Sequence, residues 1–271
     1  MVSTYYYNGN EYAPRSYASA EAGYWIASGA SAAILSPLAL ARKPFIKQLI
    51  SEQQNNHLFK DKFTKAFEIS GLKEKGVSIV HPNEIKDFTS DYAKGLNAAF
   101  MPKLNKVLIN SDKASAVGFH ELGHALNKLK SSLPVKLNSK LYGVGYAIAG
   151  YMGYLALFSR SKPKEAPKTI EDKVKDNCGK IAFAAMLPVV AEEALASIKG
   201  IKLAKKAGVD KAGIDTLKKL YSKAFLTYAG RCVLGGLAVG ASSMIMDYFT
   251  RPKKIRNNGY NFIGQKDFLY Q

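Results

Sequence analysis

Two uncharged stretches of membrane-spanning length constrain this chain more than any other feature. Gly23–Ala41 and Leu141–Ser159 each run for 19 residues without a charged side chain. A helix of about 20 apolar residues crosses the hydrocarbon layer of a bilayer, which is roughly 30 Å thick. A shorter apolar run covers Ile181–Ala191, and a longer one, Ala224–Met246, is interrupted only by Arg231. We therefore expect a mainly α, multi-pass integral membrane protein with about four membrane helices, with burial in a soluble core as the alternative.

The polar segments between these runs divide the chain into five regions. We expect an N-terminal tail and first membrane helix at 1–41, a polar region with an edge strand and a histidine-bearing helix at 42–140, a membrane hairpin at 141–197, a basic amphipathic segment at 198–223, and the last membrane helix with a basic tail at 224–271.

The charge of the chain indicates its partners. The net charge is +18, from 39 Lys and Arg against 21 Asp and Glu, and 47% of the residues are hydrophobic. This hydrophobic content excludes a disordered polybasic tail, and the excess positive charge favours a negatively charged partner. We expect membrane lipid and no nucleic acid, because the aromatic side chains fall mostly in the apolar runs rather than among the lysines. Arg42, Lys43 and Lys47 follow the first apolar run and favour the cytoplasm for what comes next.

The residues that carry chemistry are concentrated in the sequence His-Glu-Leu-Gly-His at 120–124. The surrounding stretch, 114–129, is rich in helix-forming residues and is expected to be a helix. His120 and His124 are four residues apart and leave the same face of that helix, where their imidazoles can hold one zinc ion. The alternative is a structural histidine pair that binds no metal.

Three acidic residues could complete a zinc site. Glu121 lies about 100° around the helix axis from the first histidine, so it can act as general base on a water without being a ligand. Gly123 leaves room for another element to approach. A catalytic zinc site also needs a third protein ligand. Glu192 and Glu193 are both candidates, because a carboxylate beside an apolar run is costly unless it is paired or coordinates a metal. Interfacial anchoring is the alternative for this pair.

Two further features concern how a substrate is held. Leu96–Ser111 alternates as a strand around Lys106–Ile109. An exposed edge strand there could hold a substrate backbone by β-augmentation, and an ordinary core strand is the alternative. Tyr228 and Arg231, near the start of the last apolar run, are candidates for stabilising an oxyanion, with interfacial anchoring as the alternative.

The order of these features resembles the small membrane zinc metallopeptidases of the YugP type, which are similar to the HtpX and CAAX-protease gluzincins. The resemblance rests on the HELGH sequence, on Leu187–Pro188, on Glu193–Ser197, which is similar to the family's Glu-x-x-Ala-Ser motif, and on Ala224–Ala229, and it covers about residues 97–246.

The resemblance implies a zincin-like core, in which a small β element accompanies the histidine helix. It also implies that Glu193 rather than Glu192 is the third ligand of one Zn²⁺ ion, and that Ser197 supports the ligands where related enzymes use Asp. The implied activity is that of a membrane-bound zinc-dependent endopeptidase acting on a protein or peptide substrate. We expect Glu121 and Tyr228 to be its catalytic residues and the active site to face the cytoplasm.

A non-enzymatic function is the alternative. Lys199–Lys223 contains eight lysines with apolar residues at roughly helical spacing. Such a segment could lie on an anionic lipid surface.

Overall fold

Four long helices dominate the computed structural model. They are α1 (Tyr17–Gln54), α5 (Leu133–Phe158), α7 (Cys178–Lys206) and α8 (Lys211–Thr250). All four are long and apolar enough to cross a membrane, which confirms the expected mainly helical class and the expected number of candidate spans. The structure describes residues 5–7, 10–54, 56–84 and 97–255, so the basic tail expected after the last helix lies largely outside the described residues.

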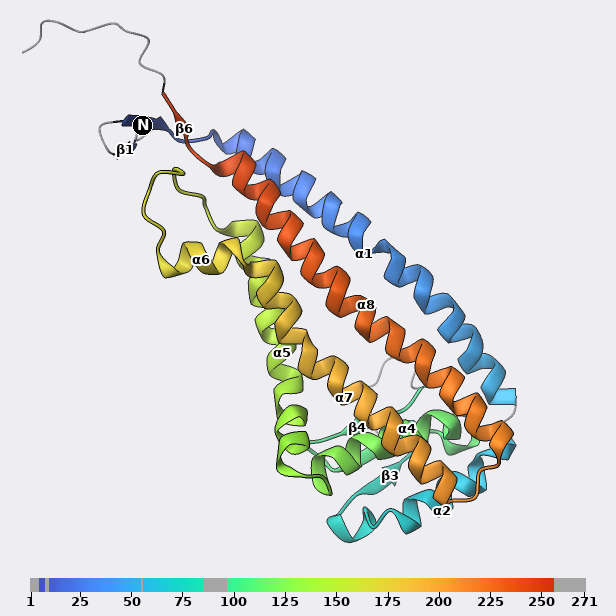
Figure 1. Cartoon of the computed structure of the whole chain (residues 1–271). Helices are drawn as coiled ribbons and strands as arrows, with labels where there is room; N and C mark the ends of the chain where they lie inside the picture. The colour runs from blue at the N-terminus through green and yellow to red at the C-terminus, as the bar shows by residue number, and fades with distance from the viewer. Residues whose placement is uncertain (1–4, 8–9, 55, 85–96, 256–271) are drawn as a thin grey trace, which may run out of the picture.

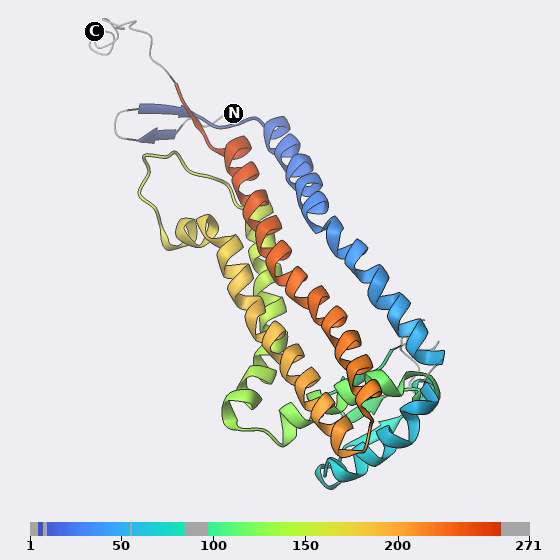
Figure 2. The same ribbon diagram turned by 45° about the vertical axis from the view of Figure 1, so that its right-hand side comes forward.

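The long helices run alongside one another, with α8 in the middle (Figures 1 and 2). Helix α1 packs on one side of α8, while α7 and α5 pack on it from the other side and against each other. At about 1.5 Å per residue, the 40 residues of α8 reach about 60 Å, which is about twice the thickness of a hydrocarbon layer. Helix α8 is therefore long enough to cross the layer and to continue beyond it.

One end of the bundle carries an end domain, which we define as α2 (Lys60–Ile69), α4 (Ser111–Leu129), a three-stranded sheet and the adjoining ends of α7 and α8. Figure 1 shows it where α7 ends and α8 begins. Its core contains large aromatic side chains: Phe119 lies 5.8 Å from Phe63 and 6.5 Å from Phe59, ring centre to ring centre. Burial of such rings is what stabilises a domain in water.

The sheet of the end domain has the strand order β3-β5-β4. Strand β5 (Lys106–Leu108) pairs in parallel with β3 (Ser78–Val80) and antiparallel with β4 (Ala99–Met101). The strand expected around Lys106–Ile109 is therefore present, but it is the central strand and not an edge. The edge strand next to α4 is β4, which pairs with β5 on one side only and contacts α4.

The far end of the bundle carries the remaining elements. Strands β1 (Tyr5–Tyr7), β2 (Asn10–Ala13) and β6 (Lys253–Lys254) form an antiparallel sheet near both chain ends, and α6 (Ile170–Asp176) connects α5 to α7. Three short 3₁₀ helices complete the described part: η1 (Asn56–Leu58), η2 (Lys73–Lys75) and η3 (Pro82–Glu84).

Two segments differ from the expected boundaries. The short apolar run before Glu192 is part of the 29-residue helix α7, which continues through Pro188. The basic segment at 198–223 is not a separate element, since it comprises the end of α7, a turn at Gly208 (φ +88°) and the first part of α8. Its apolar residues Leu203 and Leu217 are buried in the core of the end domain, so the apolar face of this segment contacts protein and not a lipid surface.

Candidate metal centre

Helix α4 carries the two histidines and is held at its start by two asparagines. The Asn110 side chain accepts a hydrogen bond from the backbone N–H of Asp112 and so caps the start of the helix. The helix is then kinked at Ala114, which has non-helical angles. The buried Asn56 side chain accepts from the N–H of Ser115 at 2.7 Å, so the donor freed by the kink is satisfied from η1.

Helix α7 approaches α4 closely because both helices have glycines at the crossing. A Cβ atom on Gly123 would overlap the backbone carbonyl of Ala196, and one on Gly200 would press on the carbonyl of Phe119. The room expected beside Gly123 is thus filled by the backbone of α7. The crossing places Glu193, one turn before Ala196, over the face of α4 from which both histidines project.

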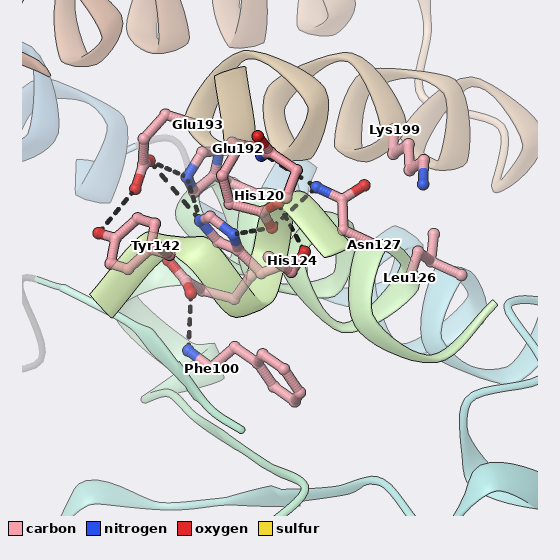
Figure 3. Close-up of polar contacts among 12 residues, drawn as sticks. Phe100, His120, His124, Leu126, Asn127, Tyr142, Glu192, Glu193 and Lys199 are labelled. Atoms are coloured by element: carbon pink, nitrogen blue, oxygen red, sulfur yellow. Dashed lines mark hydrogen bonds and ion pairs between the residues drawn. The ribbon is translucent and has the colours of Figure 1, made fainter. Parts of the chain in front are cut away.

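Three donor atoms converge at this crossing (Figure 3). The Nε2 atoms of His120 and His124 lie 3.1 Å apart, and the Glu193 Oε2 lies 3.1 Å from the first and 3.6 Å from the second. Glu193 is 3% exposed, and both imidazoles are largely covered. This group could bind a metal ion, with no lysine or arginine among the described residues hydrogen-bonded to any of the three side chains.

The Glu121 side chain is buried and turns toward the sheet. Its Oε2 accepts a hydrogen bond from the backbone N–H of Phe100 in β4, at 2.7 Å. Burial raises the pKa of the Glu121 carboxyl above its ordinary value, and the nearby imidazoles of His124 and His120 oppose that rise. A carboxyl with a raised pKa gives up and takes back a proton more readily near neutral pH than an exposed one.

Glu192 was an alternative ligand, and the structure places it elsewhere. Its Oε1 lies 3.1 Å from Nδ1 of His124, the ring nitrogen that faces away from the other two donors. The same carboxylate accepts from Asn127 at 2.9 Å and from Ser139 at 2.6 Å. Glu192 and Glu193 therefore hold opposite sides of one imidazole.

The negative surroundings act strongly on His124. Burial disfavours the charged imidazole, but hydrogen bonds to Glu192 and Glu193 outweigh burial and raise the pKa of His124 to about 10. The carboxylates around His124 thus make the centre negatively charged, and this charge favours binding of a cation such as a metal ion.

Two further side chains hydrogen-bond to the nitrogen of His120 and the oxygen of Glu193 that point away from the other donor atoms. Ser197 Oγ lies 3.1 Å from Nδ1 of His120, the position expected for a residue that supports this ligand. The Tyr142 hydroxyl of α5 donates to Oε1 of Glu193 at 3.1 Å. The interpretation of the sequence had no role for Tyr142, for Ser139 or for Asn127. Their contribution depends on how α4, α5 and α7 cross one another, which no local pattern reveals.

The candidates for oxyanion stabilisation lie on α8. The Tyr228 side chain is half-buried and within electrostatic range of Glu193 and Glu121, and its hydroxyl hydrogen-bonds to no residue that the structure describes. The guanidinium of Arg231 lies 5.8 Å from the centre of the Tyr228 ring, and the Arg231 side chain is exposed. The structure therefore places Tyr228 near the donor group and Arg231 at its margin.

Comparison of the chain with family models, with curated protein sequences and with solved structures finds no match. The interpretation of this centre therefore rests on its geometry and on the sequence pattern.

Proposed function

We propose that this chain is a membrane-bound zinc-dependent endopeptidase that cleaves peptide bonds in protein or peptide substrates. The observation that carries the proposal is the spacing of the three donor atoms, 3.1, 3.1 and 3.6 Å apart. Ligands at about 2.0–2.1 Å from a tetrahedral zinc ion are separated by about 3.3 Å. Two imidazoles and one carboxylate are also the ligand set of a catalytic zinc site that keeps one position open.

In such a site, zinc supplies Lewis acidity that polarises a carbonyl group and makes a water molecule more acidic. The Glu121 carboxylate takes the proton of the attacking water at Oε1 or Oε2 and passes it to the amine that leaves. Its burial and raised pKa suit both steps. Ser197 and Tyr142 keep His120 and Glu193 oriented while the proton moves.

The edge strand β4 supports binding of an extended substrate. Because Phe100 directs its N–H toward Glu121 and away from β5, the outer edge of β4 faces Glu121. A substrate backbone that pairs with this edge would bring a carbonyl next to the catalytic carboxylate. The free hydroxyl of Tyr228 is the proposed donor to the oxyanion. This arrangement of helix, strand and ligands supports a zincin-like core.

The position of the centre supports a membrane-associated substrate. The donor group lies where the candidate spans of α5 and α7 meet the end domain, so a substrate near the surface of the bilayer can reach it.

Lys136 and Lys140 lie at the same end of α5, as Lys43 and Lys47 do on α1. These basic residues beside the candidate spans are the basis for proposing that the active site faces the cytoplasm.

The test compares the wild type with Glu121→Gln, each purified as the full chain in detergent. We expect both to hold about one zinc ion, measured by elemental analysis, while hydrolysis of an unfolded protein substrate falls by about 10² to 10⁴ in the variant. The matched control is Glu171→Gln, an exposed residue on α6, which should keep full activity. Unchanged hydrolysis by Glu121→Gln, or a wild type that holds no metal, contradicts the proposal.

A further inference from the structure

Glu192 is a buried carboxylate with an unusual set of partners. It is 3% exposed, and it accepts hydrogen bonds from three side chains on two different helices: Asn127 of α4, Ser139 of α5 and, through Nδ1, His124 of α4. Among these partners only the imidazole can carry a positive charge. Burying a carboxylate without a cation beside it lowers stability. Pairing with His124 is therefore the contact that compensates for the burial of Glu192.

The hydrogen bond of Glu192 determines which nitrogen of His124 carries the proton. A carboxylate only accepts, so in the neutral form of His124, which is the form that binds a metal, the proton lies on Nδ1 and the lone pair on Nε2. It is Nε2 that points at His120 and Glu193, at 3.1 and 3.6 Å. The tautomer selected by Glu192 is thus the one that can bind a metal.

Asn127 shows that the surroundings are arranged for the carboxylate. Its amide nitrogen donates to Glu192 Oε1, while its own buried Oδ1 has no hydrogen-bond partner among the described residues. A buried unpaired amide oxygen costs free energy. The amide therefore gives up one partner to hold Glu192 in place.

We propose that Glu192 is a positioning residue for the metal centre, which holds His124 in the metal-binding tautomer and raises the affinity for the ion through its negative charge. This role rests on the metal binding included in the proposed function and not on peptide hydrolysis. Ser197 holds the other histidine, but a neutral hydroxyl contributes orientation without charge. The two imidazoles are consequently supported unequally, and His124 has the stronger support.

The experiment measures the affinity of the full chain in detergent for Zn²⁺ and for Co²⁺, by competition with a chromophoric chelator, in wild type, Glu192→Gln, Ser197→Ala and Glu171→Gln. Glutamine keeps the size of the side chain and can still accept from Asn127, but it lacks the charge and no longer favours one tautomer. We expect Glu192→Gln to weaken binding of both ions 10- to 100-fold, and Ser197→Ala to weaken it less. The exposed control Glu171→Gln should bind like the wild type.

Two further measurements separate positioning from a structural role. The thermal unfolding midpoint without metal should be unchanged or higher in Glu192→Gln, because a buried charge has been removed, while the rise on adding Zn²⁺ should shrink. The visible absorption of the Co²⁺ form should also change, since it reports the geometry around the ion. A variant that is less stable without metal but binds both ions as tightly as the wild type overturns the positioning role and leaves the proposed function intact. A wild type that binds neither ion overturns both.

Discussion

The end domain and the rest of the helical bundle are stabilised by different means. In the end domain, large rings such as Phe119 and Phe63 are fully buried, as they are in proteins folded in water. In the apolar bundle, which we define as the stretches of α1, α5, α7 and α8 beyond the metal centre, large side chains such as Leu237 and Met244 point outward and are 57% and 76% exposed. The helices there meet through small residues, since Gly145 approaches the carbonyl of Ala185 closely.

This difference is the one expected when water surrounds the end domain and lipid surrounds the apolar bundle. Water drives large apolar groups into a core, whereas lipid tails are as apolar as leucine and give helices no such reason to associate. Close packing of small residues and a few hydrogen bonds between helices must hold the bundle instead. The candidate metal centre lies where the two kinds of packing meet, so its polar residues lie on α7, a helix that is also long and apolar enough to cross a membrane.

The largest expected effect distinguishes the core of the end domain from the outer surface of the apolar bundle. Phe119→Ala should lower the free energy of unfolding by about 3–5 kcal/mol, because it removes a ring packed against Phe59 and Phe63. Leu237→Ala should change it by less than about 0.5 kcal/mol, because that side chain contacts lipid or detergent in both states. Denaturant unfolding of the detergent-solubilised chain measures both. Equal losses in the two variants would show that the bundle has a core like that of the end domain.

The glycine crossing at the metal centre is the next most sensitive point. Gly123→Ala should destabilise the chain by about 3 kcal/mol and abolish metal binding, because its Cβ would overlap the Ala196 carbonyl and push α7 away from α4. Gly150→Ala on α5 is the matched control, since a Cβ there meets nothing within 4 Å. Thermal unfolding and bound zinc are the measurements, and tight zinc binding by the Gly123 variant would mean that the crossing does not position Glu193.

A smaller, pH-dependent effect is expected at the far end of the bundle. Hydrogen bonds from the Thr169 hydroxyl and from Lys162 lower the pKa of Asp172 to about 2, from an ordinary value of 3.8. Because the pKa is lower in the folded state, this carboxylate stabilises the chain above about pH 4, and the stabilisation is lost as the pH falls toward 2. Asp172→Asn should therefore cost about 1 kcal/mol at pH 5 and almost nothing at pH 2.

The measurement is the thermal midpoint of wild type and variant at both pH values. Glu171→Gln is the control, because Glu171 takes no part in the capping box at the start of α6. The same loss at pH 5 and pH 2 would assign the effect to something other than the charge of Asp172.

The smallest effect concerns polar contacts between helices inside the apolar bundle. Ser31 and Ser242 join α1 to α8 through hydroxyls 2.6 Å apart. Ser242→Ala should cost about 0.6 kcal/mol, the usual size of such a contact in a membrane. Ser36→Ala, whose hydroxyl bonds only within its own helix, serves as the control. A loss of several kcal/mol would mean that hydrogen bonds, and not close packing, hold α1 in place.

Much of the architecture follows from local patterns in the sequence. The length of the uncharged runs determines that the helices can cross a membrane, because helical rise and bilayer thickness are fixed quantities. The four-residue spacing of His120 and His124 places both imidazoles on one face of α4, because that is a property of the helix itself. The proposed activity follows from this pattern and still awaits its test.

Only the tertiary structure decided which residues surround the two histidines. Adjacent glutamates differ by about 100° around α7, so the crossing angle with α4 determines that Glu193 meets both Nε2 atoms and Glu192 meets the outer Nδ1. The same holds for the edge strand, since β4 and not β5 lies next to Glu121 only because of long-range pairing. Periodicity along one helix is a local property of the sequence, whereas contacts between elements depend on how separate segments pack together, and that depends on the whole chain at once.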